Sequence, residues 1–377
     1  MTIEGQLKSN TESVQLRGTF LQGKRSDLPT MIWFSDLVEP SENFKKFFEM
    51  QNSKILDVRN VWLLDYRNMG NSDHHESFAM GDISADIVRF MDEQKITMAT
   101  LGGHGFGAKV ALATAINNME RCTGVINLEG GPLDHRYYES YQELESYVHV
   151  AKNVIDHKHD VSQATKYIND NIACKKWAAI FKQNIEEKNG LATFKFNVDD
   201  LVTDMKKTQP DVACWHQHYG LWPGNALAIF AAHSRWVHLA TNTLQFYNVV
   251  PRLQGKFPGH ISTWADSFES PLNHWLHEGP DDMSTWMLSQ RLWRWLKWHD
   301  GTNVMLADKS EAGWYNVPDR GFDVECNTRH GEYTPEHVHH NYLHTDVYQK
   351  SREARGVQGA NPGQFLPKGQ FADEEKW

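Results

Sequence analysis

One short segment, residues 103–109 (GHGFGAK), has the residue types and spacing of a nucleophile elbow. It follows a predicted strand and opens a predicted helix. In a G-x-S-x-G elbow the sharp turn exposes the central serine at the top of the sheet, and the glycines let strand and helix approach closely. The central residue here is Gly105, which has no side chain to attack an acyl carbon. Glycine-rich turns also hold phosphates or form simple tight turns, so this segment alone leaves the chemistry open.

The elements around this segment alternate between short β-type runs and helical stretches, which is typical of an α/β sheet with helices on its faces. The predicted strands span residues 14–21, 30–34, 61–65, 98–101, 124–128 and 226–231. Residues 132–222 are rich in helix formers and predict a helical lid. Strand patterns end near residue 271, where tryptophan and histidine become frequent. The expected units are a core in two parts, a lid and a C-terminal extension, over residues 1–131, 132–222, 223–270 and 271–377.

The composition excludes several classes of partner. A formal net charge of -10 over 377 residues argues against nucleic acid and against an anionic membrane surface. Four cysteines lie far apart in the sequence, which favours neither a disulfide framework nor a zinc site. No apolar run approaches the roughly 18 residues that would span a bilayer, so no transmembrane segment is expected. We expect no cofactor or metal: His337, His340 and His344 would share a helical face, but an exposed or partner-facing role is favoured.

Four segments in chain order carry a resemblance to a known family. Residues 65–72 (DYRNMGNS) look like a D-x-R-N-x-G-x-S segment, and the elbow follows at 103–107. Residues 194–199 (FKFNVD) are similar to a lid segment, and 258–260 (PGH) to the segment that delivers a catalytic histidine. The chain thereby resembles the mitochondrial abhydrolase-domain-containing hydrolases (subfamily eleven) and the small bacterial acyl-ester hydrolases related to them. The resemblance implies an α/β-hydrolase fold: a mostly parallel sheet, helices on both faces and a helical lid.

The resemblance also assigns the catalytic positions. The family's serine, acid and histidine fall at Gly105, Asn127 and His260. The loss of a triad nucleophile alone costs on the order of a million-fold in turnover, so we expect a degenerate triad and no hydrolase activity. His104 could act as a nucleophile or a base, but a packed neighbour of the elbow is the expected role. Glu129 is an alternative acid, two residues beyond Asn127.

The oxyanion region departs from the family pattern as well. The family's H-G pair aligns with Ser35 and Asp36, which places a carboxylate where an oxyanion must be stabilised. The backbone N–H of Phe106 remains available as a donor. Asp65 and Arg67 are expected to fix the loop after their strand rather than to take part in catalysis.

The C-terminal part contributes the expected partner surface. Residues 281–299 predict an amphipathic helix whose apolar face is wider than the stripe of about 100° that a surface helix needs. Its interface candidates are Trp286, Trp293, Trp295 and Trp298. We therefore expect an inactive accessory subunit, bound to other protein subunits of a mitochondrial respiratory-chain or ATP-synthase assembly. The mitochondrial location is implied by the resemblance. The alternative is a ligand-binding pseudoenzyme, or a hydrolase with altered chemistry, whose pocket takes a small acyl compound or lipid.

Overall fold

A seven-stranded sheet forms the centre of the molecule. The computed structural model describes residues 9, 11–50, 53–132, 134–215, 220–222, 224–231, 249, 260–264 and 283–298. The strands lie in the order β1-β3-β2-β4-β5-β8-β9, and only β1 runs antiparallel to its neighbour. Their bounds are β1 (Arg17–Leu21), β2 (Thr30–Phe34), β3 (Asn60–Asp65), β4 (Ala99–His104), β5 (Cys122–Leu128), β8 (Asn225–Ala231) and β9 (His260–Trp264). This mostly parallel sheet confirms the predicted fold class.

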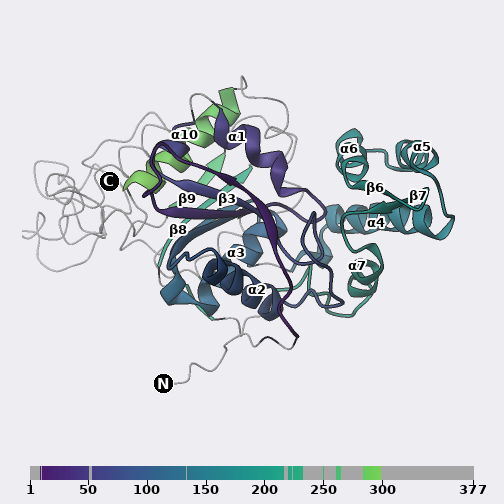
Figure 1. The fold of residues 1–377 in the computed structure, drawn as a ribbon, viewed down its shortest axis with the longest axis horizontal. Coiled ribbons are helices and arrows are strands. Elements are labelled where there is room, and N and C mark those ends of the chain that lie inside the picture. Colours follow the sequence, from purple (N-terminus) through teal and green to yellow (C-terminus); the bar gives the residue numbers. More distant parts are fainter. Residues whose placement is uncertain are drawn as a thin grey trace, which may run out of the picture.

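Helices cover both faces of the sheet (Figure 1). One face carries α2 (Met80–Glu93) and α3 (Phe106–Asn117), and the other carries α1 (Lys45–Glu49) and α10 (Met283–Trp298). Short 3₁₀ helices are η1 (Ser41–Phe44), η2 (Ile55–Asp57), η3 (Met119–Arg121) and η4 (His135–Tyr137). Alternate residues of β2 enter the two cores: Ile32 and Phe34 pack with α2 and α3, whereas Met31 and Trp33 pack on the other face. Within the described ranges, no helix combines the length and apolarity needed to cross a membrane.

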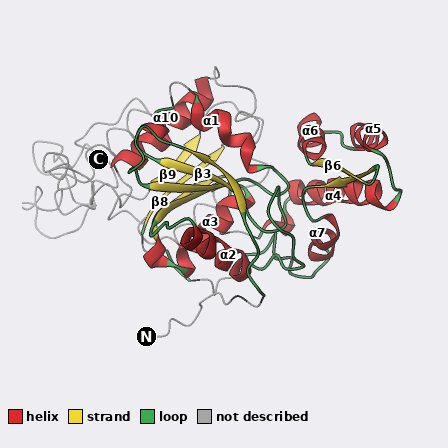
Figure 2. Cartoon of the chain, in the orientation of Figure 1, coloured by secondary structure: helices red, strands yellow, loops and turns green. Residues whose placement is uncertain are grey.

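The insert between β5 and β8 forms the lid and lies to the right of the sheet in Figure 1. Its helices are α4 (Glu139–Asp156), α5 (Val161–Asn171), α6 (Lys175–Gln183) and α7 (Val198–Met205). The insert is mostly helical, as predicted, but it also contains β6 (Ile185–Lys188) and β7 (Leu191–Phe194), which pair as an antiparallel hairpin (Figure 2). Asn189 and Gly190 form its turn with φ values of 55° and 78°. Positive φ at both residues is the geometry of a two-residue hairpin turn.

The C-terminal helix lies beyond residue 271, where we expect an extension separate from the core. A helix was predicted over residues 281–299, and α10 occupies Met283–Trp298. However, α10 covers the sheet and belongs to the core, because Trp295 is 2% exposed and its ring lies against Gly124 of β5. Trp293 is half-buried, with the ammonium groups of Lys54 and Lys297 5.1 Å and 5.5 Å from its ring. Trp295 is therefore a core residue rather than an interface residue. The side chains of Trp286 and Trp298 lie outside the described part of the chain.

Candidate active site

The turn between β4 and α3 has the strained backbone of a nucleophile elbow. Gly105 adopts φ 55° and ψ -122°, a conformation that residues with a Cβ rarely take. Its N–H donates to the carbonyl of Leu128 at 2.9 Å, which ties the elbow to the end of β5. A Cβ at Gly107 would lie 2.3 Å from the carbonyl oxygen of Ser35, so this position must also be glycine. The elbow is thus intact in its backbone while it lacks a nucleophilic side chain.

The carboxylate of Asp36 lies in the space beside Gly105. An ideal Cβ on Gly105 would be 2.2 Å from both Cγ and Oδ1 of Asp36. Oδ1 accepts hydrogen bonds from the backbone N–H groups of Phe106 at 2.7 Å and Leu37 at 2.8 Å. In an elbow hydrolase, the N–H of the residue after the nucleophile is one of the two oxyanion donors. The Asp36 carboxylate therefore occupies both the oxyanion position and the volume that a side chain at residue 105 would need.

A buried histidine sits among carboxylates next to Asp36. His104, the last residue of β4, has Nδ1 3.8 Å from Oε2 of Glu39 and Nε2 3.6 Å from Oε2 of Glu129. Burial alone would lower the pKa of His104, but its contacts with Glu129 and Glu39 and the charge of Asp36 outweigh burial and raise it to about 10. The imidazole is therefore protonated at neutral pH. Although four titratable groups meet here, no group of His, Cys, Asp or Glu among the described residues is arranged to hold a metal ion.

Burial and the neighbouring groups act in opposite directions on the pKa of Asp36. Burial raises it, and the positive charge of His104 is the largest effect that lowers it. The N–H donor of Phe106 also lowers it, while the negative charge of Glu39 raises it. Burial prevails, so the pKa lies above that of an ordinary aspartate.

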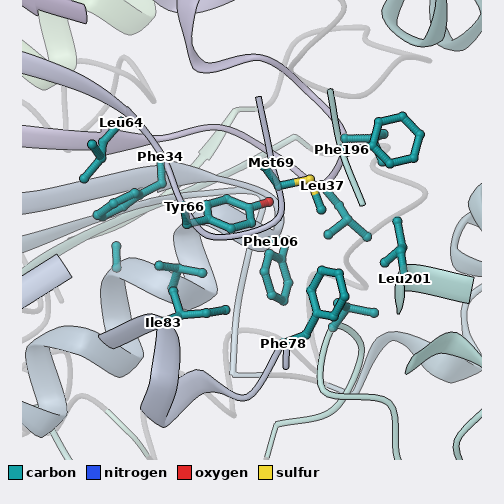
Figure 3. Close-up of a cluster of buried hydrophobic side chains, with 14 of the residues drawn as sticks. Phe34, Leu37, Leu64, Tyr66, Met69, Phe78, Ile83, Phe106, Phe196 and Leu201 are labelled. Carbon is teal, nitrogen blue, oxygen red and sulfur yellow. The ribbon is translucent and has the colours of Figure 1, made fainter. Parts of the chain in front are cut away.

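Apolar side chains from the core and the lid close over the elbow (Figure 3). The ring of Phe106 is 4% exposed and packs 5.4 Å from the ring of Tyr66. Phe78 lies beside Phe106, and Phe196 and Leu201 approach from the lid (Figure 3). The site is therefore a set of buried charged groups beneath an apolar layer to which the lid contributes.

This arrangement agrees with comparisons to known proteins. The family model for the alpha/beta hydrolase fold matches residues 40–178. A solved structure described as a marine microorganism esterase superposes with a TM-score of 0.59 at 15% identity, covering 75% of this chain and 99% of the esterase. The chain has the α/β-hydrolase fold.

Curated relatives of this chain are named as acetyltransferases. The chain is 28% identical over 123 residues to ethanol acetyltransferase 1 of Cyberlindnera fabianii, which covers 31% of this chain and 37% of the relative. It is also 28% identical over 109 residues to a probable alcohol acetyltransferase of the same yeast, covering 28% of each protein. The matched part thus spans about a third of these relatives. The expectation of an inactive structural subunit is wrong, because these relatives are named acetyltransferases and the structural neighbour an esterase.

Strand register sets the level of the His260 backbone relative to the elbow. His260 is the first residue of β9 and pairs with Leu227, which in turn pairs with Ile126. Ile126 pairs with Gly102, so the backbone of His260 lies level with the residue directly before the elbow segment, three residues before Gly105. Catalytic groups of open α/β sheets gather at the carboxyl ends of the strands. The assignment of His260 as the triad histidine stays a prediction, because its side chain lies outside the described part of the chain.

The side chains of Asn127 and Ser35 make structural hydrogen bonds. Asn127 pairs with Gly103 inside the sheet and donates from Nδ2 to the carbonyl of Ala108 at 3.2 Å, so it anchors the start of α3. The hydroxyl of Ser35 is buried and donates to the carbonyl of Glu39. Of the residues predicted for the site, the structure brings Asp36, Phe106 and Gly105 together.

The loop after β3 is structural, as its sequence suggested. The carboxylate of Asp65 accepts the N–H groups of Ser41 and Asn71, each at 3.0 Å. Arg67 is fully buried and forms a two-pronged ion pair with Asp86 at 2.6 Å and 2.9 Å. These contacts fix the loop that lies next to the lid.

Lys109 is a charged residue beside the elbow that sequence reasoning missed. It lies on α3, is fully buried, and donates from Nζ to the carbonyl of Ala213 at 2.5 Å. Burial lowers its pKa to about 7, against the opposing charges of Asp134, Cys214 and Asp36. The available signal was a single lysine inside the apolar run of residues 106–116 (FGAKVALATAI).

The three histidines His337, His340 and His344, which would share a helical face, lie outside the described residues. The mitochondrial location and the partner subunits stay predictions.

Proposed function

We propose that this chain is an acyl-transferring, hydrolase-type enzyme for small acyl esters, in which the Asp36 carboxylate replaces a seryl hydroxyl as the reactive group. The observation that carries the proposal is the position of that carboxylate across the space beside Gly105. A serine at this point of the elbow would attack the acyl carbon. Here the carboxylate of Asp36, from the loop after β2, lies beside the elbow and is held by two backbone N–H groups.

A carboxylate in this position suits general base catalysis. Asp36 removes the proton from a water or alcohol whose oxygen attacks the acyl carbon, and the leaving alkoxide then takes that proton. With water, an ester gives an acid and an alcohol; with a second alcohol, it gives a new ester and the first alcohol. Because burial raises the pKa of Asp36, the group is a stronger base than an exposed aspartate.

The remaining groups have supporting roles in this reaction. The N–H groups of Phe106 and Leu37 orient the base, since Oδ1 of Asp36 already occupies them. The protonated His104 favours the ionised form of Asp36 by its charge. No covalent acyl-enzyme forms at residue 105. The names of the curated relatives support acetyl or other short acyl groups as the substrate class.

The test compares Asp36→Asn with the unchanged chain. Asparagine keeps the shape and an acceptor oxygen but takes up no proton, so kcat/KM for p-nitrophenyl acetate should fall roughly 100-fold or more. Asp170→Asn, at an exposed aspartate of α5, is the matched control and should retain full activity. Circular dichroism melts establish that both variants fold.

Two results would overturn the proposal. Full ester turnover by Asp36→Asn would remove the carboxylate from the reaction. Fluorophosphonate labelling of a serine such as Ser35 would instead identify a covalent seryl route. Turnover in ¹⁸O-water also tests for a nucleophilic carboxylate: ¹⁸O on Asp36 would show that water opened a mixed anhydride at the aspartyl carbon, an intermediate that a general base does not form.

A further inference from the structure

A groove of about 830 Å³ opens at the amino edge of the sheet, where β2, β3 and β4 begin. Its walls come from separate segments of the chain and include Phe20, Leu28, Trp62, Lys95, Met98 and Thr123. The elbow lies at the other end of β4, and the six residues of that strand span roughly 17 Å at the usual rise per residue. The groove is therefore separate from the candidate active site.

The groove gathers apolar side chains that the fold leaves exposed. Phe20 is 45% exposed and Met98 is 38% exposed, although both are large apolar residues. The ring of Phe20 lies 5.1 Å from that of Trp62, whose ring packs in turn edge-on to Phe90 at 5.1 Å. The core residue Phe90 thus supports the aromatic wall that Phe20 and Trp62 form. Apolar surface collected in a concavity, rather than scattered singly, is typical of a ligand site.

One cation stands at the edge of this apolar surface. Lys95 is exposed, adopts φ 58° and, among the described residues, forms no ion pair. The acidic lining residue, Asp27, is already 3.3 Å from the guanidinium of Arg25. The hydroxyl groups of Thr97 and Thr123 add hydrogen-bonding capacity. The groove therefore offers an aromatic wall for a hydrophobic body and a single positive charge for an anionic end.

We infer that this groove binds a small hydrophobic monocarboxylate. The aryl or alkyl body lies against Phe20 and Trp62, and the carboxylate pairs with Lys95. The groove volume falls within the range of about 300 to 1,000 Å³ that is usual for small-molecule sites. The inference does not depend on the reaction proposed for Asp36.

The test is a calorimetric titration of the full chain with 4-phenylbutyrate and with its neutral counterpart 4-phenyl-1-butanol. Lys95→Gln should weaken binding of the acid about fivefold and leave the alcohol unchanged, because it removes one exposed ion pair. Phe20→Ala should weaken both ligands about tenfold through lost apolar contact. Asp36→Asn should change neither affinity, which separates this site from the elbow.

Two control variants make the same kinds of substitution at residues outside the groove. Lys158→Gln removes another exposed lysine with positive φ (54°), and Leu191→Ala truncates another exposed apolar residue, 40% exposed. Both should bind like the unchanged chain. The inference fails if 4-phenylbutyrate shows no saturable binding at millimolar concentration. It also fails if binding survives both Lys95→Gln and Phe20→Ala, or if Asp36→Asn abolishes it.

Discussion

The backbone N–H of Phe106 donates to Oδ1 of Asp36 at 2.7 Å, so the protein's own carboxylate fills the donor that follows the elbow. The same oxygen accepts the N–H of Leu37. A side chain at Gly105 would collide with this carboxylate. The position of the Asp36 carboxylate in the oxyanion loop therefore leaves room only for glycine at residue 105 of the elbow.

Gly105→Ser should destabilise the chain by about 2 to 5 kcal/mol, because it adds both a clash with Asp36 and strain at positive φ. The free energy of unfolding in urea measures the loss. Gly190→Ser is the matched control: Gly190 also has positive φ (78°), but a Cβ there meets nothing within 4 Å. It should therefore cost only about 1 kcal/mol, from strain alone.

Asp36→Gly should partly rescue Gly105→Ser, since it removes the atoms with which the new side chain collides. The double variant should be more stable than the sum of the single changes indicates, with a coupling free energy of about 1 to 3 kcal/mol. Strict additivity in this cycle would mean that residues 36 and 105 do not compete for space.

The acid limb of the pH–rate profile should reflect Asp36. Its pKa is raised by burial, and the base is lost when it is protonated, so kcat/KM should fall at a higher pH than an ordinary aspartate would give. His104→Gln should move this limb to still higher pH, because the positive charge of His104 lowers the pKa of Asp36. A limb that moves to lower pH in this variant would contradict the assignment.

The sheet and the elbow were predictable because their signals are local. The strand predicted at residues 30–34 is β2 to the residue, and the glycine pattern at 103–107 indicated the turn. The β6–β7 hairpin was missed although Asn189 and Gly190, the sequence signal for such a turn, separate its strands.

Other features depend on contacts between distant residues. The conformation of Asp36 depends on Phe106, which lies 70 residues away in the chain. The width of the apolar face on α10 is explained by burial against β5, where Trp295 meets Gly124, rather than by a partner protein. The position of His260 follows from strand register, which a short G-H motif does not specify.

His104 should make stability depend on pH in the alkaline range. Its pKa is raised to about 10 in the folded chain, against about 6.5 for an unperturbed histidine. Its stabilising contribution is therefore fully present below about pH 6.5 and is lost as pH rises toward 10. The difference in unfolding free energy between the unchanged chain and His104→Gln should narrow over this range. The same measurement on His157→Gln, at an exposed histidine of the lid, is the matched control.

Arg67→Met should be among the most damaging single changes, at about 3 to 5 kcal/mol, because it leaves Asp86 buried without its partner. Arg67 and Asp86 are both fully buried in their side chains, and Asp82 lies 3.8 Å from the same guanidinium. Arg89→Met is the control on the same helix as Asp86: its pair with Glu93 is exposed, so about 0.5 kcal/mol is expected. Urea unfolding of both variants measures the contrast.

The pair Arg67–Asp86 also tests whether the loop motif is structural or catalytic. Replacing both partners, as Arg67→Met with Asp86→Leu, removes the unpaired charge of Asp86 and should recover part of the lost stability, while Asp82 still lacks the guanidinium. If the motif only fixes the loop, this double variant should hydrolyse p-nitrophenyl acetate with nearly the original kcat at temperatures where it is folded. A folded double variant without turnover would instead place Arg67 or Asp86 in the reaction. In the unfolding experiment, equal losses of stability for Arg67→Met and Arg89→Met would contradict the importance of burial for the Arg67–Asp86 pair.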